Sequence, residues 1–332
     1  MGDVILSVKN LNLKFNLRGR ELHAIRDVSL DLYKGESLAI VGESGSGKSV
    51  FTKCFMGLND LNGHIESGEI VYDGKDLAKF TSEKDWLPIR GGEIAMVMQD
   101  PMTSLNPLKT IGAQIVEAIM LHQKADKAAA NAQMIEVLKD VGIDEPERRA
   151  KQYPHEFSGG MRQRVVIAIA VACKPQILIC DEPTTALDVT IQAQVLDLLR
   201  GLQSEMGTSI LFITHDLGVI AEIADDVSVM YAGRIVETSD IQTVFDQPLH
   251  PYTQGLMASR TDVSEGEIFT GANRKLPCIP GNVPTPNNLP KGCSFAPRCS
   301  KCMGKCMESM PELVDVGNGH QVRCWLYEKG AE

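Results

Sequence analysis

Hydrophobic and polar residues alternate along the first 35 positions, as they do in half-buried strands. The alternating apolar positions are Val4, Leu6 and Val8, followed by Ile25, Val28, Leu30 and Leu32. A continuous apolar run, Leu38-Ala39-Ile40-Val41, then leads directly into Gly42, Gly45 and Gly47. This pattern predicts a buried strand that ends in a glycine-rich turn, with a helix beginning near Lys48.

The middle of the chain changes to helical spacing. Between Ala113 and Val141 the apolar positions with this spacing are Ile115, Ile119, Met134, Val137, Leu138 and Val141, which predicts a helical subdomain over about residues 100–160. Apolar strand patterns return at Ile177–Asp181 and Ser209–Thr214. Between them we expect a helix capped by Asp188 and ended by Gly207, with an apolar face of Ile191, Val195, Leu198, Leu199 and Leu202,. The alternation of strands and helices predicts an α/β fold with a largely parallel sheet.

The composition changes near residue 250. Seven prolines fall between Pro277 and Pro311, and six of the nine cysteines lie at or beyond Cys278. We therefore expect a first domain over residues 1–250 and a small, loop-rich, cysteine-rich extension over residues 251–332. Such a segment has few apolar residues, so something other than a large core is expected to stabilise it.

Charge and hydropathy narrow the classes of partner. The 332 residues carry 33 Lys and Arg against 43 Asp and Glu, a net charge of −10, with no basic block. This balance disfavours nucleic acid as a partner. The longest apolar run, Val165–Cys173, is about half the length that crosses a bilayer,. The first residues lack the basic and apolar segments of a secretory signal, so we expect a cytosolic chain or one held at a membrane by partners,.

A phosphate-binding motif follows the first buried strand. The residues Gly42-Glu43-Ser44-Gly45-Ser46-Gly47-Lys48-Ser49 fit the pattern G-x-x-x-x-G-K-[ST],. Glycines in this pattern let backbone N–H groups surround phosphates at the start of a helix. Lys48 is expected to reach the terminal phosphates and the Ser49 hydroxyl to bind Mg²⁺. The flanking strand and helix disfavour a chance glycine turn.

A second part of the same site is predicted at the end of the strand Ile177–Asp181. Asp181 is the candidate for a second Mg²⁺ ligand, because a carboxylate after a buried strand is a usual metal anchor in nucleotide sites,. Glu182 is placed to polarise the attacking water,. An acidic pair after a strand can equally be an exposed loop, but the phosphate-binding motif favours the nucleotide interpretation.

The segment Phe157-Ser158-Gly159-Gly160-Met161-Arg162-Gln163-Arg164 resembles the signature sequence of ATP-binding cassette (ABC) ATPases. The commonest form of that sequence has Leu first and Gln last. The resemblance implies a RecA-like parallel sheet with an antiparallel β subdomain and a helical subdomain. It also implies that Ser158, Gly159 and Gly160 complete the ATP site of a second subunit.

Other segments resemble further elements of this family, in the family's order. Gln99 resembles the glutamine that contacts Mg²⁺ and water, and His215 resembles the histidine that contacts the γ-phosphate. Ala186-Leu187-Asp188 resembles the loop that crosses the dimer interface. Phe15 stands where the family has an aromatic residue that stacks on adenine, often Tyr. The resemblance implies an ATPase that uses Mg²⁺, with Glu182, His215 and Gln99 as its catalytic residues.

Three further stretches narrow the resemblance to the ATP-binding subunits of bacterial oligopeptide, dipeptide and nickel importers. They are residues 99–107, residues 184–194 and His250-Pro251-Tyr252-Thr253. This likeness implies a peripheral subunit on the cytoplasmic face of the membrane that powers peptide uptake. The implied partners are two membrane-spanning permease subunits and a second ATPase, either a related chain or another copy. An extracytoplasmic peptide-binding protein would act only indirectly. Nickel import, and a soluble ABC ATPase of iron–sulfur assembly or repair, are the alternatives.

The cysteines of the extension form a spaced set. Cys293-x5-Cys299-x6-Cys306-x17-Cys324 resembles the tail of importer subunits that hold a 4Fe–4S cluster on four thiolates,. The pair Cys299-x-x-Cys302 is also typical of zinc sites,. An iron–sulfur cluster, a zinc ion and free thiols therefore all remain open at this stage, and the parts played by Cys278 and Cys302 are undecided.

Overall fold

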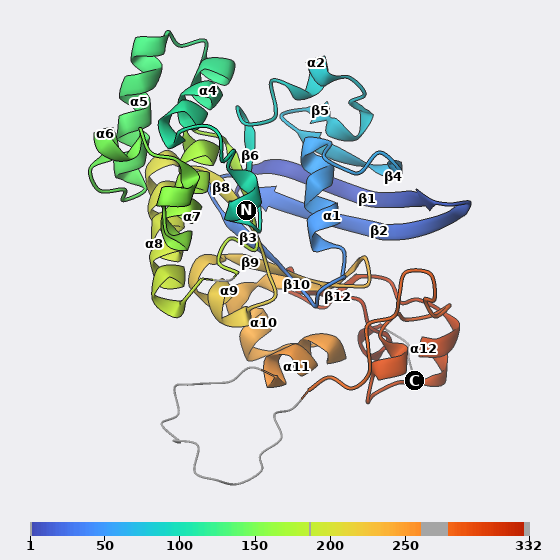
Figure 1. Ribbon diagram of the computed structural model, residues 1–332. Helices are drawn as coiled ribbons and strands as arrows, with labels where there is room; N and C mark the ends of the chain where they lie inside the picture. The colour runs from blue at the N-terminus through green and yellow to red at the C-terminus, as the bar shows by residue number, and fades with distance from the viewer. Residues whose placement is uncertain (1, 186, 260–277, 329–332) are drawn as a thin grey trace, which may run out of the picture.

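The computed structural model describes residues 2–185, 187–259 and 278–328. Two sheets organise these residues (Figure 1). The first is antiparallel, in the order β2-β1-β4-β5. Its strands are β1 (Val4–Leu17), β2 (Arg20–Tyr33), β4 (Gly63–Tyr72) and β5 (Lys75–Asp76). The alternation in the first 35 residues is thus confirmed as a pair of long strands, whose inward side chains pack on Phe51 and Phe55.

The second sheet has eight strands, in the order β11-β12-β10-β9-β3-β8-β7-β6. Its members are β3 (Ser37–Val41), β6 (Ile94–Val97), β7 (Ile177–Asp181), β8 (Ser209–Thr214), β9 (Asp226–Tyr231), β10 (Arg234–Asp240), β11 (Val314–Asp315) and β12 (Gln321–Val322). Strands β9, β3, β8, β7 and β6 are parallel neighbours. Because parallel strands end at a common edge, the residues that follow β3, β7 and β8 come together there.

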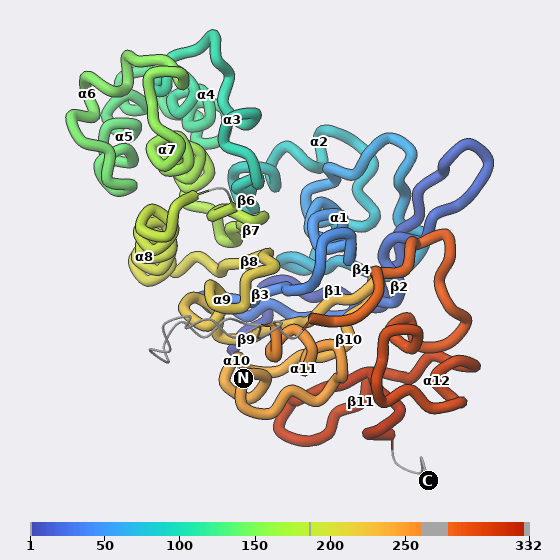
Figure 2. Tube along the Cα trace, turned by 60° about the horizontal axis from the view of Figure 1, so that its bottom comes forward, coloured from blue at the N-terminus to red at the C-terminus, as the bar shows by residue number. Residues whose placement is uncertain are grey.

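Helices cover this sheet and form a separate group at one end of the molecule. That group contains α4 (Ile111–Gln123), α5 (Lys127–Asp140) and α6 (Pro146–Arg149), and it lies away from the antiparallel sheet in both views (Figure 2). The other helices are α1 (Lys48–Lys53), α2 (Glu83–Trp86), α3 (Pro101–Ser104), α7 (Gly159–Val171), α8 (Val189–Met206), α9 (Leu217–Ile223), α10 (Ile241–Asp246), α11 (Pro251–Ala258) and α12 (Gly304–Glu308). Short 3₁₀ turns occur at Cys54–Met56, Leu77–Lys79, Pro154–Glu156, Ala296–Arg298 and Trp325–Tyr327.

Helix α8 begins and ends where its sequence predicts. The Asp188 carboxylate accepts a hydrogen bond from the backbone N–H of Ile191 at 3.0 Å, which satisfies one of the unpaired donors of the first turn. Gly207 ends the helix in the left-handed conformation, at φ 66°, which costs little without a Cβ. The buried face includes Leu196, whereas Leu198 and Ile191 are only partly buried.

The cysteine-rich extension is joined to the main sheet. Strand β12 pairs antiparallel with β10, with Val322 opposite Glu237. The Phe295 ring packs 5.3 Å from the Tyr231 ring and 5.4 Å from the Tyr252 ring, measured between centroids. Tyr252 of α11 and Phe295, both in the extension, therefore share a hydrophobic cluster with Tyr231 of β9, and the expectation of an appendage without a large core is corrected to this extent.

The helices in the described ranges are all too short or too polar to cross a bilayer.

Candidate nucleotide-binding site

The phosphate loop closes tightly on itself. A Cβ on Gly42 would lie 2.1 Å from the Met230 carbonyl oxygen, so only glycine fits this close approach,. Gly47 caps α1 at φ 105° without a side-chain hydrogen bond. The Lys48 ammonium donates to the carbonyl oxygens of Gly42 at 2.7 Å and Glu43 at 3.2 Å. The first turn of α1 and the lysine together provide N–H donors and a cation for phosphate.

The Lys48 ammonium is buried, and burial lowers its pKa, although the nearby carboxylates of Glu182 and Asp181 raise it in part. A cation that has lost water is stabilised by an anion bound beside it. The lysine is therefore suited to terminal phosphates.

Ser49 and Asp181 meet at the ends of β3 and β7. The Ser49 hydroxyl donates to the Asp181 carboxylate at 2.9 Å. Burial raises the pKa of Asp181, while this hydrogen bond lowers it. A hydroxyl and one carboxylate are a small donor set, but Mg²⁺ commonly takes only one or two protein carboxylates and completes its shell with water and phosphate. Ser49 and Asp181 therefore fit a nucleotide-bound Mg²⁺.

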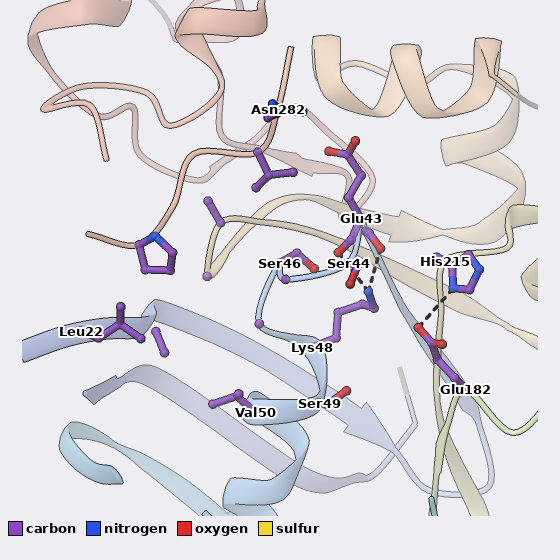
Figure 3. Close-up of a pocket in the computed structure, with 18 of the residues that line it drawn as sticks. Leu22, Glu43, Ser44, Ser46, Lys48, Ser49, Val50, Glu182, His215 and Asn282 are labelled. Atoms are coloured by element: carbon purple, nitrogen blue, oxygen red, sulfur yellow. Dashed lines mark hydrogen bonds and ion pairs between the residues drawn. The ribbon is translucent and has the colours of Figure 1, made fainter. Parts of the chain in front are cut away.

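Glu182 is the centre of a polar cluster. Its carboxylate lies 3.1 Å from Nδ1 of His215 (Figure 3). It also accepts hydrogen bonds from the Gln99 amide at 2.8 Å and the Thr185 hydroxyl at 3.0 Å. Glu182 has φ 48°, in the left-handed region, a conformation that costs energy for a residue with a side chain. The cluster holds a carboxylate at the mouth of the phosphate loop, where a general base for water can act.

One cavity of about 980 Å³ joins these groups. Twelve predicted site residues line it: Phe15, Gly42, Glu43, Ser44, Gly45, Ser46, Gly47, Lys48, Ser49, Gln99, Glu182 and His215. Asp181 lies behind it and contacts it through Ser49. The cavity also has lining residues that the sequence reasoning missed: Leu22, His23, Ala24, Val50, Thr185, Ala232, Gly233, Leu256, Gly281, Asn282, Val283 and Pro286. No local pattern marks these residues, except that Thr185 follows the acidic pair.

The structure places the signature residues elsewhere. Ser158, Gly159 and Gly160 begin α7, and neither they nor Asp188 line the cavity. The Ser158 hydroxyl accepts from the Met161 N–H at 3.4 Å. A Cβ on Gly160 would lie 2.7 Å from the Ile191 side chain, so this glycine also allows α7 to approach α8. Ala186, the first residue of the predicted interface loop, lies outside the described residues.

The four spaced cysteines come together in the extension. Cys293, Cys299, Cys306 and Cys324 line one small cavity of about 10 Å³. Burial raises the pKa of Cys293 to about 11, and it also raises the pKa of Cys299 and Cys324. In residues 2–185, 187–259 and 278–328, however, no three or more His, Cys, Asp or Glu side chains are arranged to hold a metal ion. The expected iron–sulfur or zinc site is thus not confirmed.

Comparison with known proteins agrees with this geometry. The family described as ABC transporter matches residues 25–185, and the family described as Oligopeptide/dipeptide transporter, C-terminal region, matches residues 236–306. The chain is 51% identical over 330 residues to the oligopeptide transport ATP-binding protein AppD of Bacillus subtilis (strain 168), covering 99% of this chain and 98% of AppD. It is 48% identical over 331 residues to the dipeptide transport ATP-binding protein DppD of the same strain, covering 99% and 96%.

Solved structures show the same fold. The dimeric, post-hydrolysis state of the ATP-binding cassette MJ0796 bound to ADP and Pi superposes with a TM-score of 0.64 at 26% identity, covering 71% of this chain and 98% of that one. CbiO1 from Clostridium perfringens, part of the ABC transporter complex cbiONQ, also has a TM-score of 0.64, at 28% identity, covering 74% and 92%. On its sequence matches over nearly its whole length, the chain belongs to the ABC transporter family, among the ATP-binding proteins of oligopeptide and dipeptide transport.

Proposed function

We propose that this chain hydrolyses ATP to power the uptake of peptides as a subunit of an ABC importer. The observation that supports this most directly is the convergence of Lys48, Ser49 and Glu182 on one cavity, at the common edge of β3 and β7. The names of the relatives, which are transport ATP-binding proteins for oligopeptides and dipeptides, support the transport role. They favour peptide import over nickel import and over a soluble assembly or repair ATPase.

The predicted site residues have the following roles in this proposal. The backbone N–H groups of residues 42–49 and the Lys48 ammonium bind the phosphates,. Ser49, Asp181 and Gln99 hold Mg²⁺, which neutralises charge on the phosphates when bound. The Glu182 carboxylate accepts a proton from the attacking water, and His215 orients that carboxylate at 3.1 Å,. Phe15 lines the cavity and provides an aromatic face for adenine.

The signature residues act on a second nucleotide. Ser158, Gly159, Gly160 and Asp188 are remote from the cavity of their own chain, and α7 presents the N-terminus of a 13-residue helix. We propose that they close the ATP site of a partner ATPase, either a related chain or a second copy. The dimeric arrangement of the MJ0796 cassette with ADP and Pi supports this assignment.

The chain's place in the cell follows from the same proposal. It sits on the cytoplasmic face of the membrane, bound to two membrane-spanning permease subunits, and an extracytoplasmic peptide-binding protein acts only through them.

The ABC ATPase domain covers residues 1–250, with a helical subdomain at about 100–160, and the extension covers 251–332. Nucleic acid is not a partner, since the net charge is −10,.

Affinity purification of the full chain tests this proposal. We would purify the Glu182→Gln variant from detergent-solubilised membranes with ATP and Mg²⁺ and identify the co-purifying chains by mass spectrometry. Two polytopic subunits and a second ATPase chain are expected. Recovery of soluble partners alone would contradict the importer role and favour an assembly or repair ATPase.

A second, separate proposal concerns the tail cysteines. Four thiols that line one cavity are a donor set suited to thiophilic metals, including a 4Fe–4S cluster or zinc,. Cys293, Cys299, Cys306 and Cys324 would hold the group. Iron, acid-labile sulfide and zinc should be measured in the purified chain and in the Cys306→Ser variant. Four free thiols with no bound metal in anaerobically purified protein would overturn this proposal.

A further inference from the structure

Arg298, in the cysteine-rich extension, contacts the phosphate loop directly. Its guanidinium donates to both carboxylate oxygens of Glu43, at 2.6 and 3.0 Å. The arginine side chain is only 4% exposed. Hydrogen bonds to Glu43, chiefly, raise the pKa of Arg298, so the arginine stays charged at every working pH. Although the Glu43 side chain is partly exposed, a bidentate pair with a buried arginine fixes both the distance and the orientation of its two partners.

The backbone of Glu43 also forms hydrogen bonds. Its N–H donates to the Tyr252 hydroxyl at 2.8 Å, and its carbonyl oxygen accepts from the Lys48 ammonium at 3.2 Å. The Tyr231 hydroxyl accepts from Arg298 at 3.4 Å. Two residues of the extension, Tyr252 of α11 and Arg298, therefore hold Glu43 at the same time as the phosphate-binding lysine. A shift of Glu43 would therefore move the Lys48 ammonium, which donates to the Glu43 carbonyl oxygen.

The same arginine also holds a segment of the extension against the cavity. Its Nε donates to the Pro280 carbonyl oxygen at 2.9 Å. Gly281 then turns the chain at φ 74°, and Asn282, Val283 and Pro286 line the nucleotide cavity. Figure 3 shows Asn282 on the irregular segment of the extension that passes beside Glu43.

Asn282 is exposed, and no described residue forms a hydrogen bond with its amide. An amide offers both donors and an acceptor, and the hydroxyls and phosphate oxygens of a nucleotide need both. Val283 and Pro286 offer apolar surface beside it. A segment of this kind at the rim of a phosphate site can add contacts to the ribose and phosphates without taking part in hydrolysis.

We propose that the extension is part of the ATP site, with Arg298 as a positioning residue that acts through Glu43 and with Asn282 as a nucleotide-contacting residue. ATP affinity thereby depends on the extension being docked. This inference rests on the proposed function, because it requires that the phosphate loop bind nucleotide. It adds that one side of the nucleotide site is formed by the segment around Asn282, more than 230 residues after the phosphate loop in the sequence.

The first test measures ADP binding to the full chain by isothermal titration calorimetry. Arg298→Gln is expected to weaken ADP binding roughly ten-fold, and Glu43→Gln by a similar factor. In the Glu43→Gln background, Arg298→Gln should add little, because the ion pair is already lost. Additive losses would overturn the role of Arg298 through Glu43. The turnover rate at saturating ATP should stay within about two-fold in Arg298→Gln, since a positioning residue outside the phosphate loop changes KM more than kcat.

Arg323→Gln controls for general loosening of the extension. Arg323 is also a buried arginine of the extension, but it donates to the carbonyl oxygens of Ile235 at 3.0 Å and Pro311 at 3.3 Å, away from the phosphate loop. This variant should lower the melting temperature and leave ADP affinity unchanged. An equal loss of affinity in Arg323→Gln and Arg298→Gln would overturn the proposal, because any loosening of the extension would then explain both.

The second test compares two asparagines of the same segment. Asn282→Ala is expected to weaken ADP binding roughly three- to ten-fold, whereas Asn288→Ala, at an exposed position that does not line the cavity, should not change it,. Unchanged affinity in Asn282→Ala would overturn the contact. Wild-type protein that binds no ADP would overturn the proposed function and this inference together. Normal wild-type binding with unaffected Arg298 and Asn282 variants would overturn this inference alone.

Discussion

The starts of α1 and α7 look alike in sequence and differ in their surroundings. Both are serine- and glycine-rich turns that lead into a helix, residues 42–49 and residues 158–160. At α1 the cap is Gly47, without a side-chain hydrogen bond, and Lys48 is buried beside the carboxylates of Asp181 and Glu182. At α7 the Ser158 hydroxyl itself caps the helix, and Ser158 and Gly159 are exposed.

The difference shows how one fold separates two halves of a site. A helix N-terminus attracts anions in both cases. Only α1 stands at the edge where β3 and β7 bring a cation and carboxylates together. Among the described residues, those that begin α7 do not line the nucleotide cavity, and in the proposed function they bind the phosphate of a second chain's nucleotide. Four variants test this difference between the starts of α1 and α7.

Lys48→Ala should have the largest effect. Removing the buried ammonium takes away the cation that faces the terminal phosphates, so ATP and ADP affinity should fall by about 100-fold or more,. Calorimetric titration with ADP measures the loss. A Lys53→Ala variant at the last turn of α1 serves as a control, and equal losses in the two variants would contradict the assigned role.

Glu182→Gln should separate binding from hydrolysis. The amide keeps a similar shape but cannot accept a proton from water, so ATP turnover should fall about 100- to 10,000-fold. Nucleotide affinity should remain, and ATP should hold two ATPase chains together. Phosphate release and size-exclusion chromatography with ATP measure these two properties. Turnover at the wild-type rate would remove Glu182 from the mechanism.

Ser158→Ala should affect the start of α7 and not the phosphate loop. ADP affinity of the single chain should not change, because Ser158 does not line the cavity. Turnover of the assembled transporter should fall roughly ten-fold, as expected when one hydrogen bond to a charged ligand is lost. Loss of the helix cap should cost about 0.5 kcal/mol of folding stability, at the low end for an exposed cap. Reduced ADP affinity in the isolated variant would show that the two regions belong to one site.

Asp181→Asn should have the smallest effect of the four variants. The property that changes is the folding stability. Burial raises the carboxyl pKa in the folded state above its usual value of 3.8. The folded state then binds more protons than the unfolded state, so wild-type stability falls as the pH rises through that range and remains lower at neutral pH. Without nucleotide, the variant should melt higher than the wild type at pH 7 and similarly near pH 3. A lower melting temperature at pH 7 would contradict this. The variant should also lose the Mg²⁺ dependence of ATP binding.

Much of the fold could be predicted from the chain because its signals are local. Asp188 and Gly207 bound α8 through contacts within the helix itself, and the glycines of the phosphate loop are required by backbone conformation and close approach,. The strand β8 ends at Thr214, immediately before His215, as its apolar pattern predicts. Where a short segment satisfies its own hydrogen bonds, its residues suffice to predict it.

The docking of the extension could not be predicted in this way. The Arg298–Glu43 pair joins residues 255 positions apart, and neither residue belongs to a periodic pattern. Strand β12 has two residues, which are too few to show alternation. It forms because its backbone pairs with the edge of β10. The four cysteines suggested a metal, yet two of the partly buried thiols, Cys293 and Cys299, also pack with apolar side chains.

By itself the sequence determined the phosphate loop, the acidic pair after β7 and the family to which the chain belongs. These depend on residue types at fixed short spacing, which backbone geometry and phosphate chemistry demand. Only the folded structure shows that Asp181 contacts the cavity through Ser49, and that Gly281, Asn282, Val283 and Pro286 line it. These outcomes depend on the order of strands in the sheet and on which surfaces bury one another, and no short stretch of sequence carries that information.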